Sequence, residues 1–301
     1  GVTSEACSLA GQLGLGKLIV CYDDNKITID GSTGLSFTED VGMRFEAYGW
    51  DVHTVTDVND IDSLRNALKA AHGCTTKPSL IKIRTVIGEG SAKAGTAKVH
   101  GAPLGTEDIK NLKTSYGMDP EESFVIPNDV ALAYSTVIAT GKSKEDAWNV
   151  LFNEYSTKNP ELSSEYLRRV SNKAPVGTEW RAKLPVYTHT ETKAVATRAR
   201  SEEVLNAVAN VFPEIMGGSA DLTPSNLTSL KCSSDYQKET PAGRYIRFGV
   251  REHAMAAICN GMFAHGGVRP YCATFLNFAG YAMGAMRISC LSEFGVIYVM
   301  T

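Results

Sequence analysis

The sequence predicts an α/β protein with two mostly parallel sheets, each carrying helices on both faces. Short apolar runs such as "KLIVCY", "WDVHTVT" and "PSLIKIRTVIG" alternate with amphipathic segments of helical length. The same alternation returns after a stretch without periodicity at residues 173–193. Strands that alternate with helices of this length are typical of parallel sheets covered on both sides.

The first half of the chain supplies three predicted strands and three predicted helices. Thr38, with acids behind it, is the expected start of the second helix, and Gly73 is the expected stop of the third. In chain order, we expect a helix at 4–15, a strand at 17–22, a helix at 38–49, a strand at 50–56, a helix at 58–73 and a strand at 78–88.

The middle of the chain is predicted to be helical over 107–171, with breaks near Pro120, Pro127 and Pro160. We expect domains at 1–172 and 194–301, joined by a linker at 173–193. The second domain should contain helices at 198–210, 251–263 and 276–291, and strands at 214–221, 245–249, 268–274 and 296–300.

The composition fits a globular protein of about two domains, with 301 residues, 43% of them hydrophobic and 21% charged. A net charge of −3 gives no general attraction to nucleic acid or to anionic membranes, and no apolar run approaches the roughly 18 residues of a membrane span. Seven scattered cysteines without a CxxC pair predict free thiols in a reducing compartment. We therefore expect a cytoplasmic protein, with an organelle as the alternative.

Polar side chains interrupt an apolar run at "DDNKI", residues 23–27. One interpretation is an ordinary turn, because Asp and Asn bond to nearby backbone groups. The other is a metal or phosphate site, because ligands bind beyond the carboxyl ends of strands in open α/β sheets. The amide oxygen of Asn25 and a backbone carbonyl would suit a hard cation such as Mg²⁺.

Two further segments have the composition of functional loops. The first, residues 86–103, is long, rich in glycine and alanine, and contains His100. The second, "GGSADLTPSN", contains Asp221 and Ser225 directly after a strand. Ser225 could cap a helix or bind an anion. For both segments, a surface loop without ligands remains the alternative.

The segment "FGVREHAM" places Glu252 at a predicted helix start, where the helix dipole favours an acid. The functional alternative is a buried carboxyl that shares a proton with a ring nitrogen. Phe275, Phe278 and Tyr281 follow at a spacing of three, which places them on one helical face. This row could belong to the core or could stack on a flat heterocycle.

Taken together, these motifs resemble the transketolase family along the whole chain. They occur in the order "YDDNKITIDG", "IGEGSAKAGTAKVHGAPLG", "ATR", "GGSADLTPSNLT", "GRYIRFGVREHAM" and "TFLNFAGYAMGAMR". The resemblance implies two thiamine diphosphate-binding-type domains, both incomplete. It also implies a homodimer that shares the cofactor site between subunits, phosphorylated sugar substrates, and thiamine diphosphate with Mg²⁺, Ca²⁺ or another divalent cation.

The resemblance also implies roles for individual residues. Glu252 would bond the aminopyrimidine ring nitrogen, and His100 would lie by the pyrophosphate and the substrate. The implied metal ligands are Asn25 and Ile27, the cofactor contacts are Asn25, Ile29, Ile87, His100, Asp221, Phe275, Phe278 and Tyr281, and the substrate contacts are His100, Arg198 and Ser225.

The implied reaction transfers a two-carbon ketol unit from a ketose phosphate to an aldose phosphate in the pentose phosphate pathway. A dihydroxyacetone synthase-like enzyme and a non-catalytic transketolase-like binding protein are the alternatives, whereas "GGSADLTPSN" argues against a deoxyxylulose phosphate synthase. The family's acidic metal motif has no counterpart in this sequence, and the chain begins in a helix and ends on a strand. We therefore expect a piece of a longer protein that is inactive by itself.

Overall fold

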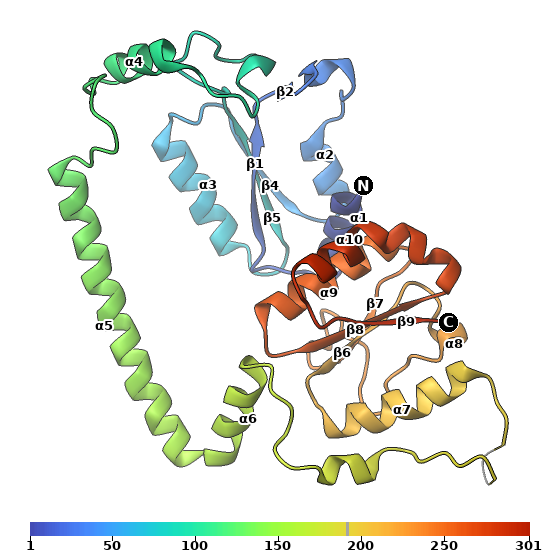
Figure 1. Ribbon diagram of the computed structural model, residues 1–301. Coiled ribbons are helices and arrows are strands. Elements are labelled where there is room, and N and C mark those ends of the chain that lie inside the picture. The colour runs from blue at the N-terminus through green and yellow to red at the C-terminus, as the bar shows by residue number, and fades with distance from the viewer. Residues whose placement is uncertain (191–192) are drawn as a thin grey trace. The chain divides into compact units, whose positions relative to one another are not determined.

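Two parallel sheets organise the chain, and each belongs to a separate unit of a computed structural model that describes residues 1–190 and 193–301. The N-terminal unit is Gly14–Phe152. The C-terminal unit is Asn153–Thr301 together with Gly1–Leu13. The predicted fold class, parallel sheets with helices on both faces, is confirmed (Figure 1).

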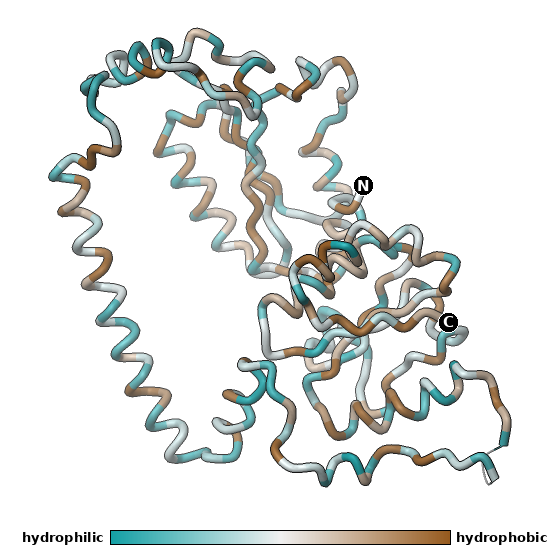
Figure 2. The backbone as a smooth tube through the Cα atoms, viewed as in Figure 1, coloured by the Kyte–Doolittle hydropathy of each residue, from teal (hydrophilic) through white to brown (hydrophobic). Residues whose placement is uncertain are grey.

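The sheet of the N-terminal unit has three parallel strands in the order β1-β5-β4. Helix α3 covers one face of this sheet and α2 covers the other (Figure 1). The buried side chains of Val55, Ala71 and Ile81 form a core between the sheet and α3, and hydrophobic residues are concentrated along the strands (Figure 2). The elements are β1 (Ile19–Asp24), α2 (Val41–Ala47), β4 (Asp51–Val55), α3 (Ile61–Gly73) and β5 (Ser79–Arg84), with a small antiparallel hairpin of β2 (Ile27–Thr28) and β3 (Gly31–Ser32) after β1.

Helix α2 begins later than the sequence suggested, so the prediction that Thr38 opens it is wrong. The N-cap residue is Asp40, whose Oδ1 accepts a hydrogen bond of 3.1 Å from the backbone N–H of Met43. Both side chains can cap, but only Asp40 lies within reach of the first free N–H groups. The predicted strand at 78–88 is also shorter than expected, because β5 ends at Arg84.

Three helices follow, and their ends agree with the predicted proline breaks. Helix α5 starts directly after Pro127, and α6 has Pro160 in its first turn, where the missing N–H costs nothing. The bounds are α4 (Thr106–Ser115), α5 (Asn128–Lys158) and α6 (Pro160–Val170). Part of the predicted linker forms a short 3₁₀ helix, Glu179–Lys183, and residues 191–192 of the linker lie outside the described residues.

The sheet of the C-terminal unit has four parallel strands in the order β7-β6-β8-β9. One face packs on α1 and α9 through a cluster that includes Leu9, Phe248 and Met255, and the other face packs on α7. The elements are α1 (Val2–Gln12), α7 (Thr197–Val211), β6 (Ile215–Ser219), α8 (Thr223–Asn226), β7 (Tyr245–Arg247), α9 (Glu252–His265), β8 (Arg269–Thr274), a 3₁₀ turn η4 (Leu276–Phe278), α10 (Ala279–Leu291) and β9 (Ile297–Met300).

The glycine pair of "GGSAD" has a packing reason. A Cβ atom on Gly217 would overlap the carbonyl of Tyr271, and one on Gly218 would overlap the carbonyl of Ile246. Strand β6 lies between β7 and β8, so both of its neighbours approach at close range. None of the helices described here is long and apolar enough to cross a membrane.

Candidate functional site

The loops that carry most of the predicted residues of the C-terminal unit leave one edge of its sheet. Because β6, β7 and β8 are parallel, their carboxyl ends lie at the same edge. Asp221 follows β6, Glu252 follows β7, and Phe275 follows β8. Strand β6 lies between β7 and β8, so these three loops are neighbours.

Glu252 is the first residue of α9, as predicted, and its side chain is half-buried. Among the described residues it makes no hydrogen bond or ion pair. The helix dipole stabilises an acid at this position, while none of the described residues bonds the carboxyl group. The carboxyl is therefore available to a ligand.

The first turn of α9 is capped from a distant part of the chain, which the sequence did not reveal. The Glu5 carboxylate on α1 accepts a 2.9 Å hydrogen bond from the Ala254 N–H. Arg251 donates a 3.1 Å hydrogen bond to the Ser8 hydroxyl on the same helix. These two contacts fix Arg251 and Ala254, on either side of Glu252. They form only because the fold brings α1 next to α9.

The three predicted aromatic residues lie in a row. The ring centroids of Phe275 and Phe278 are 6.0 Å apart, and those of Phe278 and Tyr281 are 6.3 Å apart. Tyr281 is 69% exposed, so the end of the row is open to solvent. A spacing of three therefore brought the rings together, as expected, and left aromatic surface uncovered by the described residues.

Asp221 is held in an unusual backbone conformation beside a cavity. Its φ is 60°, in the left-handed region that residues other than glycine seldom adopt. Nearby, the buried Ser219 hydroxyl donates to Asn226 Oδ1 at 2.7 Å and fixes the turn. Asp221 and Ser219 line a cavity of about 280 Å³, together with Leu9, Gln12, Leu13, Thr223, Pro224, Gln237, Arg247, Gly249 and Arg251.

Ser225 and Arg198, which were predicted from separate motifs, are in contact. The Arg198 guanidinium donates a 3.2 Å hydrogen bond to the backbone carbonyl of Ser225. The alternative that Ser225 caps a helix is wrong, because Ser225 lies inside α8 and the N-cap position is Leu222. The guanidinium is exposed, and its remaining N–H donors bond no other described residue, so they are available to an anion.

In the N-terminal unit, "DDNKI" forms the turn that one interpretation predicted. Asn25 Oδ1 accepts a 2.9 Å hydrogen bond from the Ile27 N–H. The buried Asp24 carboxylate pairs with Lys26 at 2.7 Å. The Asn25 oxygen retains a second lone pair, so the turn leaves an acceptor for a cation. Within the described ranges, no group of three or more His, Cys, Asp or Glu side chains could hold a metal ion.

The other predicted residues of this unit lie in exposed or irregular segments. Ile29 is 72% exposed, Ile87 is half-buried directly after β5, and His100 is exposed at the end of the short 3₁₀ turn Ala97–Val99. The Gly95 N–H donates to the Ile87 carbonyl at 2.8 Å, so the loop folds back on itself. All three follow the carboxyl ends of β1 or β5, which are neighbouring parallel strands.

The fold and site thus define an α/β protein whose candidate ligand residues lie at the carboxyl edges of two parallel sheets. Residues 1–175 match the family model described as "Transketolase, thiamine diphosphate binding domain", and residues 193–301 match "Transketolase, pyrimidine binding domain". The chain belongs to the transketolase family.

Individual relatives agree with the family models. The chain is 51% identical to "Transketolase 1" of Saccharomyces cerevisiae, over 100% of this chain and 45% of that protein. It is 50% identical to "Transketolase-1, chloroplastic" of Arabidopsis thaliana, over 100% of this chain and 40% of that protein. The chain therefore spans less than half the length of these relatives.

Solved structures of transketolases also match the whole of this chain. A transketolase from Pichia stipitis in complex with sedoheptulose 7-phosphate matches with a TM-score of 0.94 and 50% identity, over 100% of this chain and 45% of that chain. The transketolase from Leishmania mexicana matches with a TM-score of 0.95 and 46% identity, over 100% and 44%.

Proposed function

We propose that this chain acts within a thiamine diphosphate-dependent transketolase. The reaction transfers a two-carbon ketol unit from a ketose phosphate to an aldose phosphate in the pentose phosphate pathway. The observation that carries this proposal is the Glu252 carboxyl, which starts α9 and bonds no other described residue. Only strand β6 separates β7, which precedes Glu252, from β8, which precedes the aromatic row.

The residues at the carboxyl edges fit the cofactor's chemistry. When bound, thiamine diphosphate supplies the chemistry that breaks and re-forms a carbon–carbon bond, and the protein orients it. Asn25 and the Ile27 carbonyl offer oxygen ligands to Mg²⁺, Ca²⁺ or another divalent cation. Ile29 and Ile87 offer apolar surface, and His100 lies on the loop after β5. Further divalent-cation ligands must come from residues outside this set.

Glu252 is proposed to hydrogen-bond a ring nitrogen of the cofactor's aminopyrimidine and to hold a proton there. A carboxyl in the first turn of α9 is well placed for this role, because the packed helix fixes the position of its backbone. Phe275, Phe278 and Tyr281 would hold the aminopyrimidine ring, with Phe278 in the middle of the row as the stacking partner. Asp221, on the loop that follows the adjacent strand β6, would border the same site.

Arg198 and Ser225 are proposed to bind the substrate phosphate, and His100 to lie by the substrate. Support comes from the 3.2 Å contact between Arg198 and the Ser225 carbonyl, which holds one edge of the guanidinium near the end of the "GGSADLTPSN" segment. Planar guanidinium groups match phosphate oxygens. The related Pichia stipitis protein has been solved with sedoheptulose 7-phosphate.

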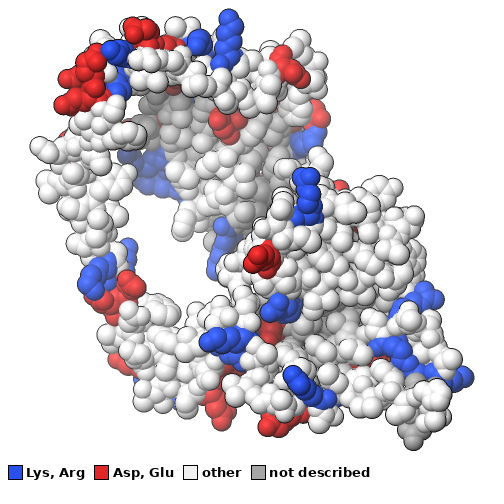
Figure 3. Space-filling model, viewed as in Figure 1, with Lys and Arg blue, Asp and Glu red and all other residues white. Residues whose placement is uncertain are grey.

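The whole protein is proposed to be a cytoplasmic or organellar homodimer whose subunits share each cofactor site. Four large apolar side chains on α10 are exposed, and charged residues are sparse over α10 in Figure 3. The four exposed side chains are Tyr281, Met283, Ile288 and Leu291. An exposed apolar face of this kind suits a second copy of the chain. The proposed domains remain 1–172 and 194–301, joined by 173–193.

The deciding experiment is a coupled assay of the full-length protein with a ketose phosphate donor and an aldose phosphate acceptor. Stripped protein should be inactive, and activity should return only when thiamine diphosphate and a divalent cation are added together. Turnover without thiamine diphosphate, or none after both additions, would contradict the proposal.

A further inference from the structure

A second cavity, of about 310 Å³, lies at the opposite edge of the C-terminal sheet. Its walls include Ile215, Arg269 and Ile297, which are the first residues of β6, β8 and β9. The proposed cofactor residues follow the other ends of these parallel strands. The cavity is therefore separate from the candidate site described above.

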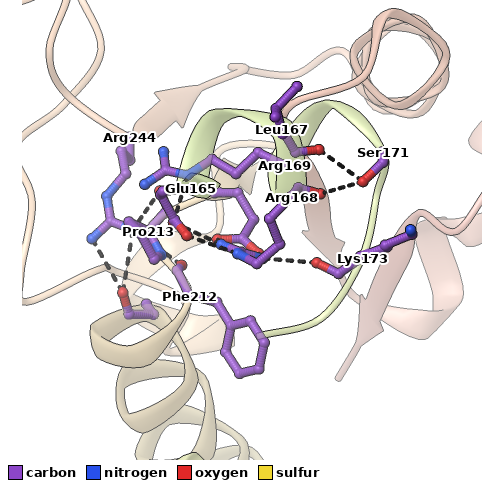
Figure 4. A network of polar contacts seen from close by, with 11 residues as sticks. Glu165, Leu167, Arg168, Arg169, Ser171, Lys173, Phe212, Pro213 and Arg244 are labelled. Carbon is purple, nitrogen blue, oxygen red and sulfur yellow. Dashed lines mark hydrogen bonds and ion pairs between the residues drawn. The ribbon is translucent and has the colours of Figure 1, made fainter. Parts of the chain in front are cut away.

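One wall of the cavity is formed by residues 172–174, which follow α6 and are fixed by a buried ion-pair network (Figure 4). Arg168 bonds Glu214 at 2.7 Å and Glu165 at 2.7 Å, and the side chains of Arg168 and Glu214 are each only 11% exposed. Arg168 also donates to the Lys173 carbonyl at 2.8 Å. These bonds hold the wall in place before any ligand arrives.

The charges that line the cavity are unbalanced toward positive. Glu214 is the one carboxylate among the described lining residues, and Arg168 neutralises it. Arg169 is paired with Glu165 at 2.8 Å. Lys173 and Arg269 form no ion pair with any carboxylate in the described part of the chain. The Arg269 guanidinium instead donates a 3.2 Å hydrogen bond to the Gly295 carbonyl and lies 5.0 Å from the centroid of the Phe263 ring. Two cations therefore remain without a counter-charge.

The rest of the lining is mainly apolar. Phe212 and Val208 come from α7, Ile215 and Ile297 from strand starts, and Val268 from the residue before β8. A cavity of this volume lies at the lower end of the range of small-molecule sites, roughly 300–1,000 Å³. Its apolar walls favour a ligand with a compact apolar body.

We propose that this cavity binds a small phosphate monoester with an apolar or aromatic body, and that Lys173 and Arg269 bind its phosphate. A phosphate monoester carries up to two negative charges near neutral pH, which matches the two unpaired cations. Charge-assisted bonds to such groups are strong, and the guanidinium fork suits phosphate oxygens. Binding would tie residues 172–174 to the strand starts and would stabilise the C-terminal unit.

The test is isothermal titration calorimetry of the full-length protein with phenyl phosphate. Inorganic phosphate carries the charge without the body, and benzyl alcohol carries the body without the charge. Phenyl phosphate should bind with one saturable site and at least about tenfold more tightly than either probe, since it satisfies both parts of the cavity. Equal affinity for inorganic phosphate, or no saturable binding, would overturn the proposal.

Four variants locate the binding. Lys173→Gln should weaken it about tenfold through loss of a charge-assisted contact, and Ala174→Trp should weaken it by filling the cavity from an exposed position. Lys238→Gln removes an equal charge from an exposed site in the same unit and should have no effect. Arg198→Ala should also leave phenyl phosphate binding unchanged. Binding that survives the first two variants, or that is lost in Arg198→Ala, would refute the assignment.

Discussion

The two units hold their proposed cofactor residues in different ways. In the C-terminal unit, Glu252 starts a helix in which Ala254, Met255 and Ala256 are fully buried. In the N-terminal unit, Ile29 and His100 lie exposed, on a hairpin and on an irregular loop. The proposed residues around Glu252 thus lie on a packed element, whereas the proposed residues of the N-terminal unit lie on turns.

The difference follows from the packing beneath each half. The C-terminal sheet has four strands and hydrophobic clusters on both faces, whereas the N-terminal sheet has three strands and a smaller buried cluster against α3. Groups on rigid elements keep their geometry better than groups on loops. We therefore expect the proposed residues around Glu252 to be preorganised, and the proposed metal-binding residues around Asn25 to need their ligand and further residues to order them.

The largest expected effect tests the proposed metal-binding residues, Asn25 and Ile27. The 301-residue chain by itself should bind thiamine diphosphate and Mg²⁺ weakly and should show no turnover. Asn25 already accepts a bond from Ile27, and no acidic cluster in the described ranges can offset the cost of dehydrating the cation. Calorimetry measures the binding, and a coupled assay with a ketose phosphate measures the turnover. Tight binding together with turnover would show that the residues of this chain suffice for catalysis.

The next largest effect tests the proposed role of Glu252. Glu252→Ala in the full-length protein should lower turnover by a factor of about 10² to 10⁴, because a proton partner is lost. The fold should persist, since the Glu252 side chain bonds no other described residue. Kinetics at saturating cofactor, with Glu239→Ala as control, measure the effect. Near wild-type turnover would remove Glu252 from the mechanism.

A stability comparison then contrasts one ion pair from each unit. Arg168→Met should lower the free energy of unfolding by about 3 kcal/mol, because it leaves Glu214 buried without its partner. Arg65→Met breaks the exposed pair with Asp62 and should cost less than about 1 kcal/mol. Urea unfolding measures both. Similar losses would mean that the network in Figure 4 contributes no more than a surface pair.

A smaller effect is expected at the substrate phosphate. Arg198→Ala should raise KM about tenfold for phosphorylated sugars and much less for unphosphorylated ones, because only the former lose a charge-assisted contact. Parallel kinetics on both substrate types measure the ratio. Equal increases would show that Arg198 binds no phosphate, and its 3.2 Å contact with Ser225 would then be structural.

The smallest effect concerns acid stability. Hydrogen bonds from Arg168 and then Arg169 lower the pKa of Glu165 from 4.5 to about 2. Its contribution is therefore present above pH 4.5 and is lost as the pH falls toward 2. Glu165→Gln should flatten the fall in unfolding free energy within this window, and Glu161→Gln on the same helix should not. An unchanged acid profile would mean that Glu165 forms these bonds in the unfolded chain as well.

Local pattern was enough to predict much of this protein. Periodicity, prolines and strand alternation predicted the strands, the helix breaks and the parallel sheets, because these depend on neighbours within a few residues. The same local logic placed Glu252 at a helix start and brought Phe275, Phe278 and Tyr281 into one row. The family motifs then connected these positions with a cofactor.

The tertiary structure alone decided which distant residues meet. The bond from Ala254 to Glu5, the pair of Arg168 with Glu214 and the contact of Arg198 with Ser225 join segments that no periodicity relates. The choice of Asp40 over Thr38 as the helix cap also depended on where the chain turned. Side-chain chemistry defines which partners are possible, but the packing of helices on the sheets brings particular pairs within hydrogen-bond distance.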